Sequence, residues 1–164
     1  MKHLRRFNES IDDKNDLYEF CEGYLAYLLD DSSFELDVFN TVDVDIIISM
    51  AICLTRYGEG KGRYLKTRQI EFTWSEIKDY YIPFLHILNK EYKIVSTTGS
   101  EFDKTDKYIY LPPVVHFFDS VNNVDLEFSL EKVLSGVSLS IDKLPIVEVY
   151  VEVINLAERQ EKYD

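Results

Sequence analysis

The stretch IVEVYVEVI (residues 146–154) carries the plainest structural pattern in the chain. Valines recur at every second position from Val147 to Val153, and Glu148, Tyr150 and Glu152 stand between them. Successive side chains of a strand point to opposite faces, so this period of two predicts a strand with one buried and one polar face. The fold therefore contains at least one long strand that packs against a core.

Similar runs elsewhere predict further strands. In the second half of the chain these are KIVST (93–97), KYIYL (107–111), VDLEFSL (124–130) and VSLSI (137–141). In the first half, the alternation from Phe34 to Val38 predicts a strand, Asn40-Thr41 a tight connection, and Val42 the start of a long second strand through the apolar run IIISMAICL. A helix over residues 44–56 is an open alternative, because a short apolar run fits both structures. The glycines of RYGEGKGRY then predict a turn, and YLKTRQIEF a returning strand.

Two segments have the spacing of amphipathic helices. Between residues 12 and 30 the apolar side chains form one stripe, made of Leu17, Phe20, Cys21, Tyr24 and Leu28. Thr73 and Glu76 fit a capping box that opens a second helix. Pro83 lies within this second helix, and we expect it to kink or divide the helix.

Two main helices and about eight strands in consecutive runs indicate the α+β class with a largely antiparallel sheet. A length of 164 residues favours one domain. We expect a basic N-terminal head over residues 1–11, a single α+β domain over residues 12–156 and a charged tail over residues 157–164.

Charge is distributed unevenly. The formal net charge is −12, yet eight of the 18 basic residues lie in two islands: Lys2, Arg5 and Arg6, then Arg56, Lys61, Arg63, Lys66 and Arg68. The rest of the chain is more acidic than the total, and such a surface repels phosphate backbones. We therefore expect no direct nucleic-acid binding; the acidic surface instead attracts a protein partner with a basic surface, or it only keeps the protein soluble.

Targeting and redox features point to a reducing compartment. No apolar run reaches the roughly 20 residues that a membrane span needs, and the N-terminus has no apolar signal core. The two cysteines, Cys21 and Cys53, lie in apolar runs and are expected to be buried thiols. These features predict a protein that is neither secreted nor membrane-bound.

Four carboxylates form the candidate metal site: Glu35, Asp37, Asp43 and Asp45. If the two predicted strands pair across Asn40-Thr41, the four side chains share one face, and a divalent cation such as Mg²⁺ or Ca²⁺ relieves their repulsion. The alternative is a solvated polar face. We favour the solvated face because no loop glycine or further ligand accompanies the quartet, and we expect no cofactor.

The remaining motifs favour structural or contact roles. The glycine loop with Arg63 lacks the P-loop pattern, so a basic hairpin tip that contacts an acidic neighbour, such as a second copy, is preferred over a phosphate site. His3, His86 and His116 have no metal-ligand spacing, and the last two are expected to be hydrogen-bonded, partly buried histidines. Five aromatic residues are assigned to packing, because a nucleic-acid stacking platform needs interleaved cations: Tyr108, Tyr110, Phe117, Phe118 and Tyr150.

The N-terminal stretch MKHLRRFNES resembles the start of many small tailed-bacteriophage proteins, and is similar to the capsid-targeting leaders of myovirus internal proteins. The resemblance implies cleavage after Glu9 at the sequence Phe7-Asn8-Glu9. It departs from that pattern in Phe7, where Leu or Ile is expected, and in Arg5-Arg6. On physical grounds, Leu4 and Phe7 are spaced to form an amphipathic turn that docks on a partner, and a disordered terminus is the alternative.

These observations support three functional hypotheses. The first is a non-enzymatic bacteriophage protein, located in the virion or the host cytoplasm, that acts through protein–protein contacts and self-assembly. Its expected contact residues are those of the head and the basic islands: Lys2, Leu4, Arg5, Arg6, Phe7, Arg56, Lys61, Arg63, Lys66 and Arg68. The second is an acidic, DNA-mimicking inhibitor of a host DNA-binding or defence protein. The third is a metal-dependent enzyme that uses the acidic quartet.

Overall fold

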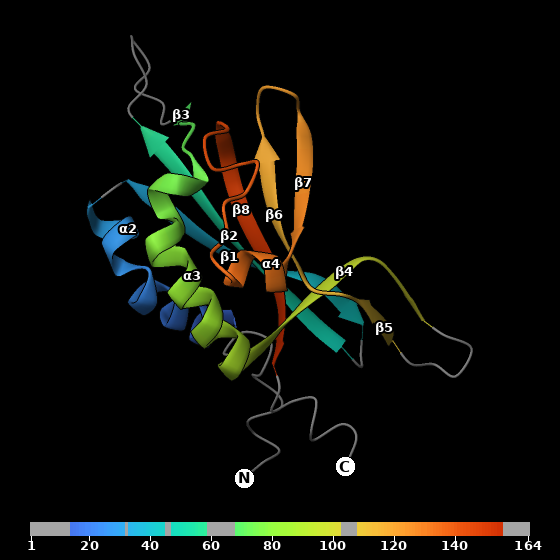
Figure 1. The fold of residues 1–164 in the computed structure, drawn as a ribbon. Coiled ribbons are helices and arrows are strands. Elements are labelled where there is room, and N and C mark those ends of the chain that lie inside the picture. Colours follow the sequence, from blue (N-terminus) through green and yellow to red (C-terminus); the bar gives the residue numbers. More distant parts are fainter. Residues whose placement is uncertain (1–13, 32, 45–46, 59–67, 103–107, 156–164) are drawn as a thin grey trace.

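Figure 1 shows the computed structural model of the chain, which describes residues 14–31, 33–44, 47–58, 68–102 and 108–155. Its helices are residues 14–24, α2 (Ala26–Asp31), α3 (Trp74–Glu91) and α4 (Leu130–Leu134). Its strands are β1 (Phe34–Val44), β2 (Ile47–Gly58), β3 (Arg68–Gln69), β4 (Tyr92–Phe102), β5 (Tyr108–Leu111), β6 (Val114–Asp119), β7 (Val124–Ser129) and β8 (Ile146–Asn155). All paired strands are antiparallel, so the predicted α+β class with an antiparallel sheet is confirmed. The predicted head and tail lie outside the described residues.

The sheet is arranged around β8 (Figure 1). One edge of β8 pairs with β2, while the other edge pairs with β6 along its first half and with β4 along its second half. Hairpins then add β1 to β2 and β7 to β6. The short strands β3 and β5 pair with β2 and β4, and the expected number of about eight strands depends on whether they are counted with the main sheet. The buried face predicted for residues 146–154 is confirmed at Val149, Val151 and Val153, which are fully buried, whereas Val147 is half-buried and Glu152 on the opposite face is also buried.

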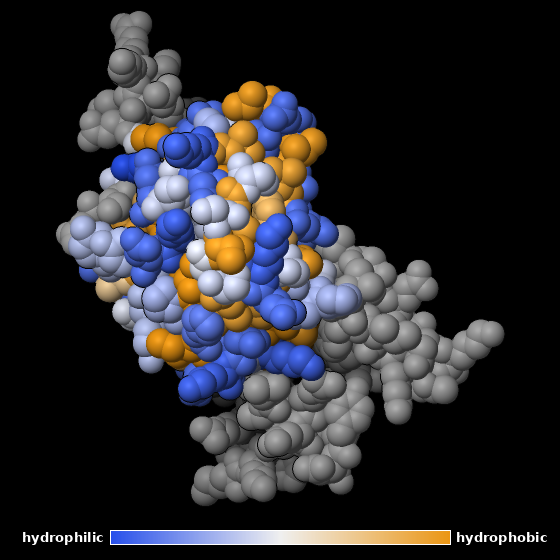
Figure 2. Space-filling model, in the orientation of Figure 1, coloured by the Kyte–Doolittle hydropathy of each residue, from blue (hydrophilic) through white to orange (hydrophobic). Residues whose placement is uncertain are grey.

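The helices cover one face of this sheet and form the core with it. Leu17 and Cys21 of the first helix and Ile77 of α3 pack in the same cluster as Ile52 of β2 and Val151 of β8. The ring of Trp74 lies edge-on to the rings of Tyr81 and Phe117, at centroid distances of 5.8 and 5.1 Å. Figure 2 shows this helix-covered side from outside, where hydrophilic and hydrophobic residues are intermixed over the described part. Among the described residues, no helix is long and apolar enough to cross a membrane.

The predicted connection at Asn40-Thr41 is wrong. Strand β1 continues through these residues to Val44, and its pairing with β2 shifts by a bulge between Asn40 and Val42. The Thr41 and Ser49 hydroxyls lie 2.7 Å apart across this bulge, so the extra residue is held by a hydrogen bond and does not turn the chain. The alternative of a helix over residues 44–56 is also wrong, because β2 occupies Ile47–Gly58.

Two predictions in the second half also differ from the structure. The run VSLSI is not a strand. Leu139 and Ile141 are buried, but they belong to a series of turns. In these turns Asp142 N–H donates to the Leu139 carbonyl, and Leu144 N–H donates to the Ile141 carbonyl. Conversely, β6 was not predicted. Its run VVHFF is apolar on both faces and follows two prolines, so it lacks the period of two.

Helix α3 matches its predicted position. Thr73 is the N-cap residue with extended backbone, but its side chain makes no capping hydrogen bond, and Glu76 instead pairs with Arg56 at 3.6 Å. Pro83 lies inside the helix without dividing it. The first predicted helix is interrupted at Leu25, which separates residues 14–24 from α2.

Candidate functional site

The sheet face opposite the helices carries the polar and ionisable side chains of the strands; we call it the helix-free face. Strand pairing aligns one row of five residues across it, in the order Asp37, Cys53, Tyr150, His116 and Glu127. Each member alternates with a residue of the core, such as Leu54, Val149 or Phe117. A second aligned row contains Glu35, Thr55, Glu148, Phe118 and Asp125. Three strands from separate parts of the chain, β1, β8 and β7, thus present acidic residues on one surface.

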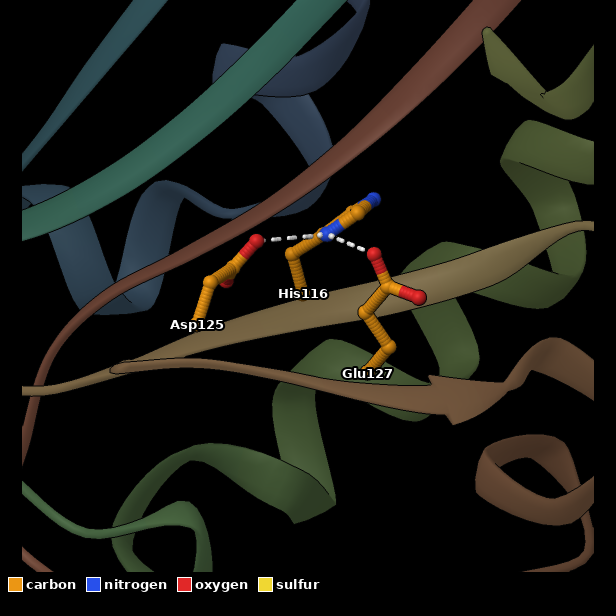
Figure 3. A group of neighbouring side chains, drawn as sticks. All are labelled: His116, Asp125 and Glu127. Atoms are coloured by element: carbon orange, nitrogen blue, oxygen red, sulfur yellow. Dashed lines mark hydrogen bonds and ion pairs between the residues drawn. The ribbon is translucent and has the colours of Figure 1, made fainter. Parts of the chain in front are cut away.

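His116 lies between Tyr150 and Glu127, toward the β7 edge of this surface. Its Nδ1 lies 3.0 Å from Oδ2 of Asp125 and 3.6 Å from Oε1 of Glu127. Figure 3 shows the two carboxylates on either side of the imidazole nitrogen, with His116 on β6 and both acids on β7. The His116 side chain is only 1% exposed, whereas those of Asp125 and Glu127 are 36% and 49% exposed. A buried imidazole therefore meets two acids that reach solvent.

Tyr150 supports this arrangement from β8. Its ring stacks on the His116 imidazole with a centroid distance of 4.2 Å and an interplanar angle of 5°. Its hydroxyl donates a 3.0 Å hydrogen bond to the same Asp125 oxygen that faces His116. Burial, that hydrogen bond and the nearby carboxylates raise the pKa of the Tyr150 phenol, so the phenol stays a donor over the physiological range.

The thiol of Cys53, which lies next to Tyr150 in the first row, is a poor nucleophile. Burial and the carboxylates of Glu148, Asp37 and Glu152 raise the pKa of Cys53, so it stays a neutral thiol. Tyr150 stands between Cys53 and His116 in the row, which separates their backbones by about 10 Å, or two strand spacings. The Nε2 atom of His116 is buried and has no hydrogen-bond partner among the described residues. The row therefore does not form a cysteine–histidine pair.

The predicted acidic quartet is not brought together by strand pairing. Glu35 and Asp37 are exposed on β1, and Asp43 lies further along the same strand, about 26 Å from Glu35. Their partners on β2 are Thr55, Cys53 and Ile48, not carboxylates. Asp45 and the side chain of Asp43 lie outside the described residues. The pairing on which the metal-dependent enzyme hypothesis rested is therefore absent from β1 and β2, and we do not carry this hypothesis further.

Of the predicted contact residues, the structure describes the side chain of Arg56 alone. Its guanidinium lies over the Phe34 ring at 5.5 Å and pairs with Glu76, so Arg56 is engaged within its own chain. For Arg68 only the backbone is described. The other predicted contact residues lie outside the described residues: Lys2, Leu4, Arg5, Arg6, Phe7, Lys61, Arg63 and Lys66. Their role as contact residues stays a prediction.

Sequence reasoning missed the combination of His116, Asp125 and Glu127. It correctly expected His116 to be buried and hydrogen-bonded, but the same expectation for His86 was wrong, because His86 is exposed on α3. Asp125 and Glu127 alternate within a predicted strand. It did not identify β6 as the partner of that strand. The available signal was the short separation between the apolar run VVHFF and VDLEFSL, which is typical of a hairpin.

Comparison of the chain with protein-family models, with curated proteins and with solved structures found no match. The fold and the helix-free face are therefore the basis for the functional inference.

Proposed function

We propose that this chain is a non-enzymatic bacteriophage protein that acts through protein–protein contacts, with the helix-free face as its binding surface. The supporting observation is the concentration of acidic residues on that face, drawn from β1, β8 and β7: Glu35, Asp37, Glu148, Asp125 and Glu127. Such a surface attracts a basic partner and accelerates its encounter. The proposed location is the virion or the host cytoplasm.

A second copy of the chain is the proposed partner. The sequence carries its own basic segment, with Lys61, Arg63 and Lys66 between β2 and β3. The net charge of −12 opposes assembly at long range, but a Debye length of about 8 Å screens that repulsion at physiological salt. Contacts between the basic segment and exposed carboxylates act at distances shorter than the Debye length. Whether two copies associate therefore depends on local charge complementarity and not on net charge.

Light scattering coupled to size-exclusion chromatography tests this assembly. We expect an oligomer near 0.15 M salt, and we expect the double variant E35Q/D37N to weaken self-association by about tenfold, because two exposed charge pairs are lost. D16N/D79N is the matched control, since it removes the same charge from exposed positions on the helices. A strict monomer at every salt and protein concentration would overturn self-assembly. Equal weakening of self-association in both double variants would show that the helix-free face is not the interface.

An acidic inhibitor that imitates DNA is the second candidate, and the same five carboxylates favour it. It differs in the partner, which is a DNA-binding protein of the host. Pull-downs from host lysate with the wild type, E35Q/D37N and D16N/D79N as baits separate the two. Capture of a DNA-binding protein by the wild type and the control, but not by E35Q/D37N, supports the inhibitor, whereas recovery of no basic protein by any bait counts against it.

A further inference from the structure

We propose that His116, Asp125 and Glu127 bind a divalent transition-metal ion such as Zn²⁺. The three ligand atoms, His116 Nδ1 and one carboxylate oxygen from each acid, all lie within 4.8 Å of one another. Two adjacent strands position them on one face: Glu127 is directly opposite His116, and Asp125 is two residues before Glu127. This inference goes beyond protein contact, because it assigns a ligand to the β6–β7 side of the helix-free face.

Two of the three donor separations fit one ion, and the two carboxylate oxygens lie within 4.8 Å of each other. Zn²⁺ lies about 2.1 Å from imidazole nitrogen and carboxylate oxygen, so neighbouring donors in a tetrahedral site are about 3.4 Å apart. The nitrogen–oxygen separations here, 3.0 and 3.6 Å, lie on either side of that value. Imidazole with two carboxylates is a donor set suited to Zn²⁺ or Mn²⁺ more than to Mg²⁺. The ion takes the position of the Nδ1 proton, which leaves the imidazole as its Nε2–H tautomer.

Electrostatics favour a cation at this place. Among the described residues, Asp125 and Glu127 contact the imidazole of His116 and pair with no lysine or arginine. Glu148 lies in the same aligned row as Asp125 and adds negative potential. Both carboxylates are partly exposed, so the ion reaches them from solvent. The buried imidazole of His116 then binds the ion from the interior side of the site.

Tyr150 acts as a positioning residue for the site. Its hydroxyl donates to Asp125 Oδ2, and its ring fixes the plane of the imidazole by stacking. Hydrogen bonds of this kind orient metal ligands and contribute about 10- to 100-fold to affinity. The variant Y150F keeps the stacked ring and removes only the hydroxyl, so we expect about tenfold weaker metal binding.

Isothermal titration of the chelator-treated full chain with Zn²⁺ and with Mg²⁺ tests the site. We expect one Zn²⁺ per chain, a rise in melting temperature on binding, and Zn²⁺ binding tighter than Mg²⁺. E127Q removes one ligand at an exposed position and should weaken Zn²⁺ binding at least about tenfold. E35Q is the matched control, because Glu35 lies on the same face, on β1, away from His116.

Two outcomes would overturn the site. One is no heat and no melting shift at millimolar Zn²⁺. The other is equal loss of affinity in E127Q and E35Q, which assigns the binding to general surface charge. Imidazole ¹⁵N spectra add a measurement that does not depend on a variant folding: Zn²⁺ should shift the Nδ1 resonance of His116 more than its Nε2 resonance. The metal stoichiometry from titration and the Nδ1 shift of His116 do not report oligomer size, so these two readouts test the metal site separately from the proposed self-assembly.

Discussion

Tyr81 shows at the scale of a single residue how the core tolerates a polar atom. The side chain is fully buried between the rings of Trp74 and Phe84. Its hydroxyl has no hydrogen-bond partner among the described residues, and burial raises the pKa of the phenol well above its ordinary value. A buried hydroxyl without a partner costs free energy, because it loses its hydrogen bonds to water without replacement.

Removing that hydroxyl should stabilise the protein. We expect Y81F to raise the free energy of unfolding by about 1 kcal/mol, since the ring and its edge-on contacts remain. Chemical denaturation measures the change. The control is Y24F, which removes a hydroxyl from a side chain that is 51% exposed and should change stability by less than about 0.5 kcal/mol. Destabilisation by Y81F would mean that the hydroxyl has a partner in the folded protein.

Helix α3 is the clearest case at the scale of an element. It runs for 18 residues with Pro83 inside it, although proline lacks the N–H that the carbonyl of Asp79 would accept. Its buried residues include Ile77 before the proline and Phe84 and Leu88 after it, so the helix packs against the core on both sides of Pro83. Tertiary packing therefore offsets the local cost of Pro83.

The cost of Pro83 is measurable by substitution. Pro83 is exposed, so P83A restores a backbone donor without opening a cavity, and we expect about 2 kcal/mol of stabilisation once the gain in unfolded-state entropy is subtracted. H86A on the same helix, also at an exposed position, is the control and should contribute less than about 0.7 kcal/mol. If P83A does not exceed H86A in a denaturation experiment, then a bend at Pro83 is needed by the packed helix.

The β6–β7 hairpin depends on Asp119 at its turn. The Asp119 carboxylate accepts the Asn122 side-chain amide at 2.7 Å and the backbone N–H groups of Val121 and Asn122 at 3.0 and 3.2 Å. The amide of Asn122 is the main cause that lowers the pKa of Asp119 below its ordinary value of 3.8, with the two N–H groups adding to it and burial opposing it. Because the folded pKa is lowered, the carboxylate contributes stability above the unfolded pKa, and this contribution is lost as pH falls through the folded pKa.

D119N should therefore reduce stability in a pH-dependent way. We expect its melting temperature to fall below that of the wild type at pH 7, and the difference to shrink as the pH is lowered below about 3.8. N122A removes the same side-chain bond from the other partner, so the double variant should lose little more than the larger single loss. A constant difference between wild type and D119N at all pH values would contradict this role of the carboxylate.

At the scale of the whole molecule, the two faces of the sheet have different roles. The face covered by the helices forms one continuous core, from Leu17 near the first described residue to Val153 near the last. The helix-free face gathers carboxylates from strands that are far apart along the chain, with β8 at its centre. The proposed self-assembly and metal site both use this second face, and the charge-matched variants on the two faces separate its contribution from that of net charge.

Much of the fold was predictable because its signals are local. The α+β class, the buried valines of β8 and the position of α3 follow from spacing within each segment. The wrong predictions concern segments whose structure depends on contacts with neighbouring strands. The bulge in β1 is held by Ser49 of the next strand, and β6 is buried on both faces, so its own period carries no signal. The strand pairing expected for the acidic quartet was wrong, because it depended on a turn at Asn40-Thr41.

The sequence by itself determined which residues alternate between core and polar faces, because side-chain direction along a strand is a property of the local backbone. The tertiary structure alone decided that Asp37, Cys53, Tyr150, His116 and Glu127 stand in one row, and that His116 meets Asp125 and Glu127. The physical reason is that strand neighbours and their register depend on how the whole chain packs its apolar faces together. No single segment contains that information.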